Sequence, residues 1–260
     1  MHIVVCTKQT PDSAAKLTVD AAGVVSWGDS PIVINPWDEY AVEEALLIKE
    51  RLGDVKVTVV SVGPEAALEA LKHAIAMGCD EAVRVWDDSF QNIDSLGTAR
   101  VLAAAIKKMG DVDLVLMGKS AIDSQTGQVA VALARQLGFA PLTYVIKINE
   151  LDPAGKIAAE RLLEEGRQVV EAPLPAVVGT TKGINEPRYP SFMGIRKATR
   201  AAYPLWSAAD VGVQAGTPGV RWGNITPPPA REGSAEIISA DTPEEAARLL
   251  VDRLLAEKVI

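Results

Sequence analysis

Histidine and cysteine are scarce in this chain. Its 260 residues include two histidines, His2 and His73, and two cysteines, Cys6 and Cys79. Neither histidine lies in a recognisable nucleophile or metal-binding motif, and the cysteines lie in apolar surroundings without metal or redox spacing. These absences argue against a Ser-His-Asp hydrolase and against a zinc enzyme. They also predict that no metal is bound, and the cysteine usage fits a reducing compartment.

Positive charge and long apolar runs are also lacking. The formal net charge is −8, which argues against a nucleic-acid-binding protein, because such proteins need a basic field to neutralise phosphates. The apolar runs are far shorter than the roughly 18 residues of a membrane span. The chain begins directly in a strand pattern, so we expect no signal or transit peptide and a cytoplasmic protein without membrane insertion.

Strand and helix patterns alternate through the first part of the chain. The predicted strands are 2–7, 56–62, 81–86, 113–117 and 142–148, and the predicted helices are 37–52, 65–77, 95–109 and 126–137. Short apolar strands between helices indicate a mostly parallel sheet that is covered on both faces. The sequence therefore predicts an α/β fold with a doubly wound sheet, whose ligand lies beyond the carboxyl ends of the strands.

The pattern changes after residue 150. Residues 156–161 and 167–171 predict a β-hairpin, and residues 175–179 predict one more buried strand. Residues 204–240 are rich in proline and glycine yet carry apolar side chains such as Trp206 and Trp222. Either an arm that lies on another subunit or a tail wrapped on its own domain would explain this composition. A final helix is predicted from Thr242 as N-cap with Pro243 at its first position.

The loop after the strand at 113–117 is the first candidate binding element. Gly118-Lys119-Ser120 suggests a phosphate-binding P-loop, but the position that requires the first glycine is Asp113, so the motif fails. The remaining loop is polar and opens a helix, whose free N–H groups favour an anion. The alternative is that Ser124 or Thr126 simply caps an ordinary helix.

Two further junctions lie at the same predicted edge of the sheet. Asn35-Pro36-Trp37-Asp38 leads into a helix, so Asn35 is a candidate ligand for a base or phosphate, or else an N-cap with Pro36 behind it. Val62-Gly63-Pro64 ends a strand with no side chain at Gly63 to obstruct a ligand. Three such junctions around one strand end favour a nucleotide pocket over any single motif.

Residues 185–200 form a stiff turn followed by a basic helix. Phe192 stands among polar neighbours, and Arg196, Lys197 and Arg200 follow at helical spacing. One interpretation is a solvated basic helix with Phe192 buried in the core. The other is an exposed aromatic anchor beside a basic patch, which is the usual form of a binding hot spot.

Several blocks together resemble the β subunit of electron-transfer flavoproteins, over essentially the whole chain. They are VCTKQ at 5–9, NP at 35–36, AVEEA at 41–45, AMGCD at 76–80, DLVL at 113–116, AID at 121–123, LPAVV at 174–178 and NEPRY at 185–189. The resemblance implies an adenine-nucleotide-binding α/β domain at 1–203, which includes a docking loop at 185–200. It also implies a C-terminal arm and helix at 204–260 that pack on a partner subunit.

The resemblance implies an electron carrier rather than an enzyme. It implies a heterodimer whose α subunit holds most of the redox-active FAD, while the β subunit binds AMP. The flavin-dependent dehydrogenases that exchange electrons with such proteins include acyl-CoA dehydrogenase. This agrees with the lack of hydrolase or transferase side-chain arrangements, because an electron carrier needs a held cofactor and a docking surface.

The resemblance also places the sites on particular residues. The AMP pocket would use Cys6, Asn35, Pro36, Trp37, Asp38, Val62, Ala121, Ile122, Asp123, Ser124, Gln125, Thr126, Gly127, Gln128 and Val129. The docking surface for the dehydrogenase would use Asn185, Glu186, Pro187, Arg188, Tyr189, Phe192, Arg196 and Lys197. Phe192 takes the apolar anchor position, where many relatives have leucine.

Two alternatives remain open at this stage. Some family members bind a second FAD in place of AMP and use NADH to split electron pairs, and both the loop length and Asp38 resemble that form. Against that form, Ser124 and Gln125 replace its Gly-Asp pair, and Ala130 and Val131 replace its Gly-Pro pair. A Cβ at residue 130 would narrow the path of a dinucleotide, which favours AMP. The other alternative is a stand-alone nucleotide-binding or nucleotide-hydrolysing α/β domain.

Overall fold

The protein divides into two compact units. The computed structural model describes residues 1–214, 216–221, 223–229 and 235–260, and its units are Met1–Ile225 and Thr226–Ile260. The predicted arm includes Trp222 and residues 230–234, which lie outside the described residues. The predicted boundary at residue 203 falls inside the first unit, because Leu205–Trp206 adds a strand to its main sheet.

A nine-stranded sheet organises the first unit within the described residues, in the order β11-β10-β9-β12-β8-β1-β6-β7-β13. Its strands are β1 His2–Thr7, β6 Lys56–Val62, β7 Glu81–Val85, β8 Leu114–Gly118, β9 Ala140–Asp152, β10 Lys156–Leu163, β11 Gly166–Pro173, β12 Ala176–Thr180 and β13 Leu205–Trp206. From β9 through β12, β8, β1, β6 and β7 to β13, neighbouring strands pair in parallel. β10 pairs antiparallel with both β9 and β11, and β10 and β11 form the predicted hairpin. The mostly parallel α/β fold is therefore confirmed.

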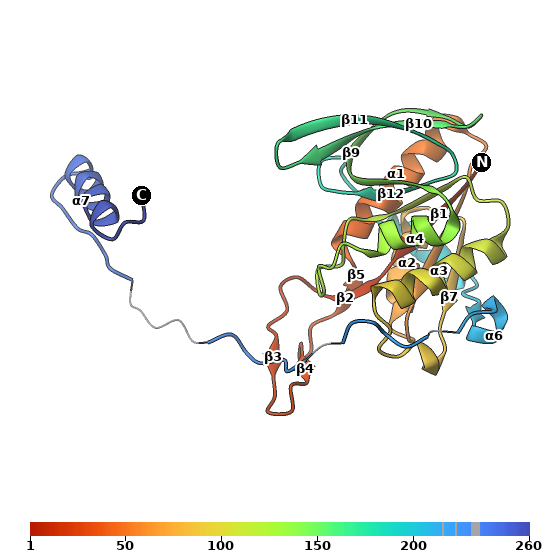
Figure 1. Ribbon diagram of the computed structural model, residues 1–260, viewed down its shortest axis with the longest axis horizontal. Helices are drawn as coiled ribbons and strands as arrows, with labels where there is room; N and C mark the ends of the chain where they lie inside the picture. The colour runs from red at the N-terminus through yellow and green to blue at the C-terminus, as the bar shows by residue number, and fades with distance from the viewer. Residues whose placement is uncertain (215, 222, 230–234) are drawn as a thin grey trace. The chain divides into compact units, whose positions relative to one another are not determined.

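Helices cover both faces of this sheet (Figure 1). The helices of the first unit, within the described residues, are α1 Pro36–Leu52, α2 Ala67–Met77, α3 Ser95–Met109, α4 Val129–Leu137, α5 Phe192–Arg200 and α6 Ala208–Val211. The second unit carries α7 Pro243–Ala256. In β1, Ile3 and Val5 pack with α1 and α2, whereas Val4 and Cys6 pack with α3 and α4. This strict alternation buries the strand on both faces, as a doubly wound sheet requires.

Several short elements were not predicted from the sequence. They are β2 Gln9–Pro11, β3 Thr18–Val19, β4 Val25–Ser26, β5 Ile32–Ile34, the 3-10 turn η1 Asp88–Phe90, and β13 and α6 described above. β2 pairs with β5 in an antiparallel ribbon outside the main sheet. This ribbon returns the chain from the end of β1 to the start of α1, and so brings Lys8 and Asn35 together.

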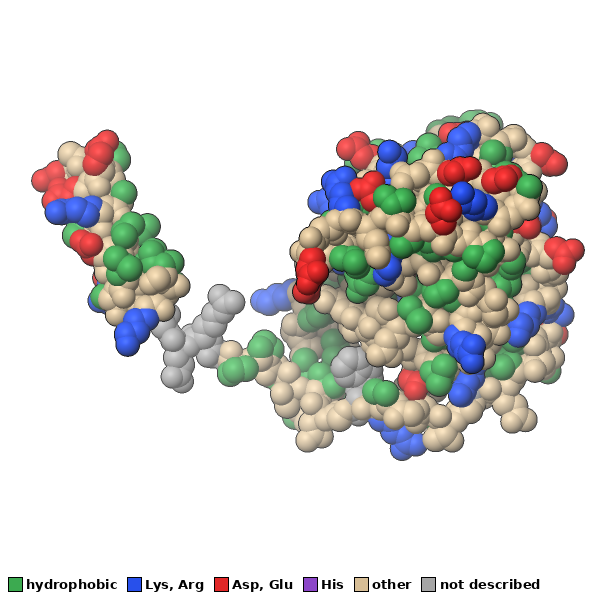
Figure 2. All heavy atoms as spheres, turned by 45° about the horizontal axis from the view of Figure 1, so that its top comes forward, with side chains coloured by type: hydrophobic (Ala, Val, Ile, Leu, Met, Phe, Trp, Pro, Cys, Tyr) green, Lys and Arg blue, Asp and Glu red, His purple; other side chains and the backbone are tan. Residues whose placement is uncertain are grey.

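The second unit carries α7, whose start agrees with the sequence prediction. Thr242 is the N-cap, its hydroxyl accepts a hydrogen bond from the N–H of Glu245, and Pro243 follows at the first position. Leu249, Leu250 and Leu255 are exposed along it, and Figure 2 shows hydrophobic side chains gathered on this helix. No helix among the described residues is long and apolar enough to cross a membrane.

Candidate functional site

The candidate site lies at the carboxyl ends of β1 and β8. After β1 the chain builds β6 and β7 on one side of that strand, and it then crosses to build β8 on the other side. This reversal of strand order is the topological switch point, where ligands bind in open α/β sheets. The start of α1 and the loop from Lys119 to Gln128 both lie at this edge.

Asp38 is the central side chain of the edge. It lies in the first turn of α1 and is 5% exposed. Its carboxylate accepts hydrogen bonds from the N–H of Lys8 at 2.8 Å and from the N–H of Gly118 at 3.0 Å. Those two residues follow β1 and end β8, so one carboxylate joins the helix to both strands that flank the switch point.

The Asp38 carboxyl titrates far from its ordinary range. Burial raises its pKa to about 7, although hydrogen bonds from Asn35, Lys8 and Gly118 favour the charged form and oppose the rise. An unfolded aspartate has a pKa of about 3.9. The folded protein therefore holds more protons than the unfolded chain between about pH 4 and pH 7, so rising pH lowers the free energy of unfolding across this window.

Asp38→Asn tests this titration, because the amide has no proton to lose. We expect the free energy of unfolding of the variant to rise relative to wild type as the pH increases from 5 to 8. Urea unfolding at four pH values across that range measures the difference between the two proteins. A difference that stays constant across the range would show that Asp38 is already ionised at pH 5.

Asn35 connects α1 to the loop after β8. It is the N-cap residue of α1, with Pro36 at the first helical position, but its side chain makes no capping hydrogen bond. Instead its amide donates to the carbonyl oxygen of Ser120 at 2.9 Å and accepts from the N–H of Ile122 at 3.1 Å. The predicted N-cap position of Asn35, with Pro36 behind it, is therefore confirmed, but its side chain holds the loop that the resemblance assigns to the nucleotide.

Two more contacts fix this loop. The Lys8 ammonium lies 2.6 Å from a carboxylate oxygen of Asp123. The Ser95 hydroxyl, at the start of α3, donates to the Thr126 hydroxyl at 3.1 Å. The loop is thereby held at both ends, by the segment after β1 and by α3.

Helix α4 starts three residues later than the sequence predicts, at Val129 instead of Thr126. Its N-cap is Gln128, without a side-chain capping bond, so neither Ser124 nor Thr126 caps it. The first backbone bond into the helix runs from the N–H of Ala132 to the oxygen of Gln128. The N–H groups of its first turn are therefore open to an anion, in agreement with the binding interpretation.

The loop enters α4 through a left-handed turn. Gln125 has a φ of 48° and Gly127 a φ of 63°. A Cβ at Gly127 would meet the oxygen of Lys119 at 3.7 Å, which is an ordinary contact. Glycine is thus needed for the backbone conformation, and a valine there would strain the turn whether or not a phosphate lies beside it.

The other predicted pocket residues lie at the edge in different ways. Trp37, in the first turn of α1, lies under the Lys119 ammonium at 4.3 Å from its ring centroid. Val62 ends β6 and is partly buried. Cys6 is 3% exposed, and its side chain packs in the apolar cluster with α3 and α4, where burial raises the pKa of the thiol. The side chain of Cys6 therefore belongs to the hydrophobic core.

Two residues at this edge, Thr7 and Gln9, were not identified from the sequence as pocket residues. Thr7, at the end of β1, has a buried hydroxyl without a partner among the described residues, and the same holds for the Gln9 side-chain oxygen. A Cβ at Gly63 would lie 2.9 Å from the Gln9 amide. The missing side chain at Gly63, just after β6, therefore makes room for Gln9 at the start of β2.

The predicted docking segment is fastened to the domain by three of its polar residues. Asn185 donates to the oxygen of Tyr40 and to Glu44, both at 3.0 Å. Arg188 binds Glu43 through two nitrogens at 2.8 Å each, and it also pairs with Glu50. The Lys197 ammonium donates to the oxygen of Cys79 at 2.8 Å. These hydrogen bonds and ion pairs hold the segment in place against α1 and against Cys79, which lies beyond the end of α2.

The apolar residues of the same segment face outward. Tyr189 is 95% exposed, Phe192 74%, Met193 69% and Ile195 52%. The interpretation that buries Phe192 in the core is therefore wrong. Arg196 and Arg200 are also exposed, and together with the four apolar residues they form what we call the α5 patch.

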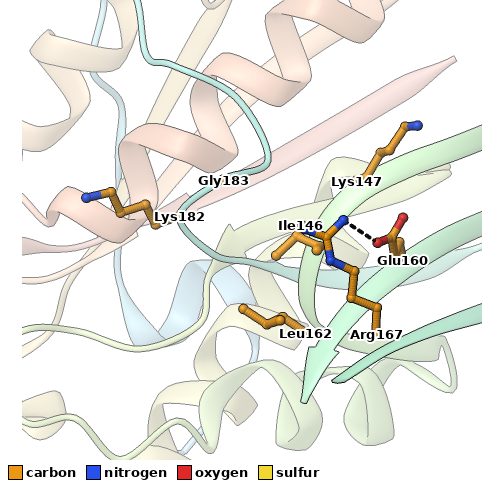
Figure 3. A pocket seen from close by; sticks show the side chains of 7 residues that line it. All are labelled: Ile146, Lys147, Glu160, Leu162, Arg167, Lys182 and Gly183. Atoms are coloured by element: carbon orange, nitrogen blue, oxygen red, sulfur yellow. Dashed lines mark hydrogen bonds and ion pairs between the residues drawn. The ribbon is translucent and has the colours of Figure 1, made fainter. Parts of the chain in front are cut away.

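A cavity away from the switch-point edge has side chains that do not converge on a ligand. It has a volume of about 240 Å³ and lies beside β9, β10 and β11, where Lys147, Glu160, Arg167 and Lys182 contribute to its lining. Figure 3 shows the Lys147 and Lys182 amines pointing away from each other, and Arg167 pairs with Glu160 at 3.0 Å. The described residues contain no group of three or more His, Cys, Asp or Glu side chains that could hold a metal ion.

Comparison with known proteins agrees with this geometry. The family model described as the electron transfer flavoprotein domain matches residues 24–211. Over the full length of both chains, this chain is 38% identical to the electron transfer flavoprotein subunit beta of Clostridium acetobutylicum. It is 36% identical, again over both full lengths, to the caffeyl-CoA reductase-Etf complex subunit CarD of Acetobacterium woodii.

A third relative covers somewhat less of the chain. Protein FixA of Azorhizobium caulinodans is 39% identical over 82% of this chain and 78% of its own length. The family match includes α1, β8, the loop at 119–128 and the α5 patch. Three relatives that are matched over the full length of both chains carry the name electron transfer flavoprotein subunit beta. The chain belongs to the electron-transfer flavoprotein family, as a β subunit.

Proposed function

We propose that this chain binds AMP at the switch-point edge and works in the cytoplasm as one half of a heterodimer. Its α partner holds most of the FAD, which the β subunit helps to enclose. The heterodimer carries electrons between flavin-dependent dehydrogenases, such as acyl-CoA dehydrogenase, and a downstream acceptor. The observation that carries the proposal is the buried Asp38, which joins β1, β8 and α1 at the point where this fold binds ligands.

The residues at this edge suit an adenine nucleotide. The first turn of α4 offers backbone N–H groups without a side-chain cap, which fit a phosphate. The buried Thr7 hydroxyl lacks a partner in the described residues and is a candidate polar contact. In this arrangement Asn35 and Asp38 orient the loop at 120–129, and the nucleotide serves as a structural ligand.

An alternative ligand for the same site is a second FAD, with NADH as electron donor. The sequence favours AMP because Ala130 replaces a glycine on the path of a dinucleotide. In the structure, however, Ala130 is 4% exposed and packs in the core, with its Cβ 3.7 Å from the position that a Cβ at Gly179 would take. The Ala130 methyl group therefore faces the sheet. Of the two residues that replace the Gly-Pro pair, Val131, which is 48% exposed, is the one at the surface.

Release of the bound nucleotides tests the proposal. The chain is co-expressed with its α subunit, the complex is purified, and the nucleotides are released by denaturation and separated by chromatography. We expect one FAD and one AMP per heterodimer. A result of two FAD per heterodimer, one of them reducible by NADH, would show that the site holds a second FAD and not AMP. A stable monomer that hydrolyses ATP would contradict the whole proposal.

We propose that the α5 patch docks the partner dehydrogenase. Phe192→Ala is expected to weaken that complex about thirtyfold, because truncating a hot-spot anchor costs about 2 kcal/mol. FAD content and heterodimer formation should stay unchanged, since Phe192 is 74% exposed and belongs to no core cluster of the described residues. The rate of electron transfer, measured against dehydrogenase concentration, gives the apparent affinity.

Val169→Ala is the matched control for Phe192→Ala. Val169 is an apolar residue on β11 that is 64% exposed and lies outside the α5 patch. We expect its truncation to leave the apparent affinity for the dehydrogenase unchanged. Equal effects of the two substitutions would refute a specific role for Phe192.

A further inference from the structure

Tyr144 has a backbone conformation that its residue type disfavours. It lies within β9, yet its φ is +57°. A left-handed backbone at a bulky aromatic residue is an outlier that costs free energy. The strand pairing also shifts register here, because Val178 of β12 pairs with Leu142 whereas Thr180 pairs with Val145. Such bulges re-aim a side chain, and they occur often beside active sites.

Packing of the ring does not account for this conformation. Tyr144 is 44% exposed and belongs to neither apolar cluster of the described residues. Among the described residues no group forms a hydrogen bond with its hydroxyl. Strained residues persist where the surroundings over-determine them, and they gather at ligand sites.

The re-aimed ring reaches the nucleotide loop. The Tyr144 hydroxyl lies 3.9 Å from the position that a Cβ at Gly127 would take, beside the turn that enters α4. The Lys119 ammonium lies 6.0 Å from the centroid of the Tyr144 ring and 4.3 Å from that of Trp37. Three elements, β9, α1 and the loop after β8, thus bring a hydroxyl and a cation to one place.

Lys119 differs from the other lysine at this edge. The Lys8 ammonium is neutralised by Asp123 at 2.6 Å, whereas Lys119 forms no ion pair with a carboxylate of the described residues. Its position between two aromatic faces is a cation–π arrangement. Such an arrangement holds the charge in place without neutralising it, so the charge stays available to an anion.

We propose that Tyr144 and Lys119 bind the phosphate of the adenine nucleotide. The Tyr144 hydroxyl donates a hydrogen bond to that phosphate, and the Lys119 ammonium supplies positive charge. The strained backbone at Tyr144 is kept because it aims the hydroxyl at the ligand. This inference rests on the proposed nucleotide site and adds two binding residues to it.

Three variants of the co-purified heterodimer, stripped of nucleotide and titrated with AMP, test the inference. Tyr144→Phe removes only the hydroxyl, and we expect the Kd for AMP to rise about tenfold, because a hydrogen bond to a charged group is lost. Tyr144→Gly relieves the backbone, so we expect the Kd to rise at least as much while the melting temperature without AMP does not fall. Tyr189→Phe, which removes a hydroxyl from the α5 patch, should leave the Kd unchanged.

The outcomes separate the inference from the function on which it rests. A Kd for Tyr144→Phe within twofold of wild type would overturn the role of the hydroxyl. A lower melting temperature for nucleotide-free Tyr144→Gly, with an unchanged Kd, would show that the ring is structural. Wild type that releases no adenine nucleotide and binds none would overturn both the site and the role of Tyr144. If the released nucleotide is FAD, the same ratios are expected with FAD as the titrant.

Discussion

Arg188→Ala is expected to lower the free energy of unfolding by about 3 kcal/mol, at the lower end of the cost of leaving one member of a buried ion pair alone, because Glu43 is buried whereas the Arg188 side chain is 34% exposed. Its partner Glu43 is 4% exposed and receives two guanidinium nitrogens at 2.8 Å as well as the Arg188 N–H at 3.1 Å. Without the guanidinium, Glu43 either stays charged in a buried place or takes up a proton. Urea unfolding at pH 7 measures the loss.

The same substitution should also reduce docking. Arg188 joins the segment before α5 to α1, so its removal frees the residues that lead to Phe192. We expect electron transfer with the dehydrogenase to slow although Phe192 itself is unchanged. Crosslinking or hydrogen exchange at residues 185–195 would show whether the segment has loosened.

Glu50→Ala is the control, because it removes the second partner of the same guanidinium. The Glu50 side chain is 58% exposed although it lies 2.6 Å from Arg188. Exposed ion pairs contribute about 1 kcal/mol or less, because water screens both charges. A loss of 3 kcal/mol or more for Glu50→Ala, or of less than 1 kcal/mol for Arg188→Ala, would contradict this division of roles.

The docking segment shows a limit of sequence reasoning. Phe192, Asn185, Arg188 and Lys197 were assigned together to one surface, but the structure separates an exposed anchor from side chains that fasten the segment. Arg188 and Glu43 lie 145 positions apart in the chain. No local pattern relates them, so their pairing could be found only from the packed fold.

The main elements of the fold could be predicted, because each is long enough to show a period. The strands at His2–Thr7 and Lys56–Val62 and the helix at Ser95–Met109 have the predicted bounds. The two-residue and three-residue strands β2 to β5 carry no period that could be recognised. The addition of Leu205–Trp206 to the sheet edge depends on a long-range pairing with β7, which composition cannot indicate.

The candidate site was predicted in position more than in detail. The junctions at Asn35 and at residues 118–129 do meet at one edge, because parallel strands end on the same side of the sheet. The individual roles depend on distances across the edge. Asn35 is the N-cap residue of α1, but its side chain holds the loop after β8, and Tyr144 reaches the site through a register shift in β9. A bulge of this kind leaves no mark in the alternation of a single sequence.

Among the strand glycines at this edge, Gly118 is the one whose substitution is expected to lower stability and nucleotide binding most. Gly118 ends β8, and its N–H donates to Asp38 at 3.0 Å. A Cβ there would lie 2.6 Å from the Asp38 carboxylate oxygen and also 2.6 Å from the backbone carbon and the Cβ of Trp37. Because two of these three atoms belong to the backbone or lie next to it, no side-chain rotation can remove the conflict.

Gly118→Ala should therefore force α1 away from β8 at the switch point. We expect the free energy of unfolding to fall by about 3 kcal/mol, at the upper end of overpacking costs, and the proposed heterodimer to lose the adenine nucleotide that we assign to this edge. Gly179→Ala, on the neighbouring strand β12, is the control, since its Cβ would meet Ala130 and Thr143 at 3.7 Å, an ordinary contact. That variant should fold as well as wild type and keep its nucleotide. If Gly118→Ala also kept both stability and nucleotide, the close approach of α1 to β8 would not be what builds this site.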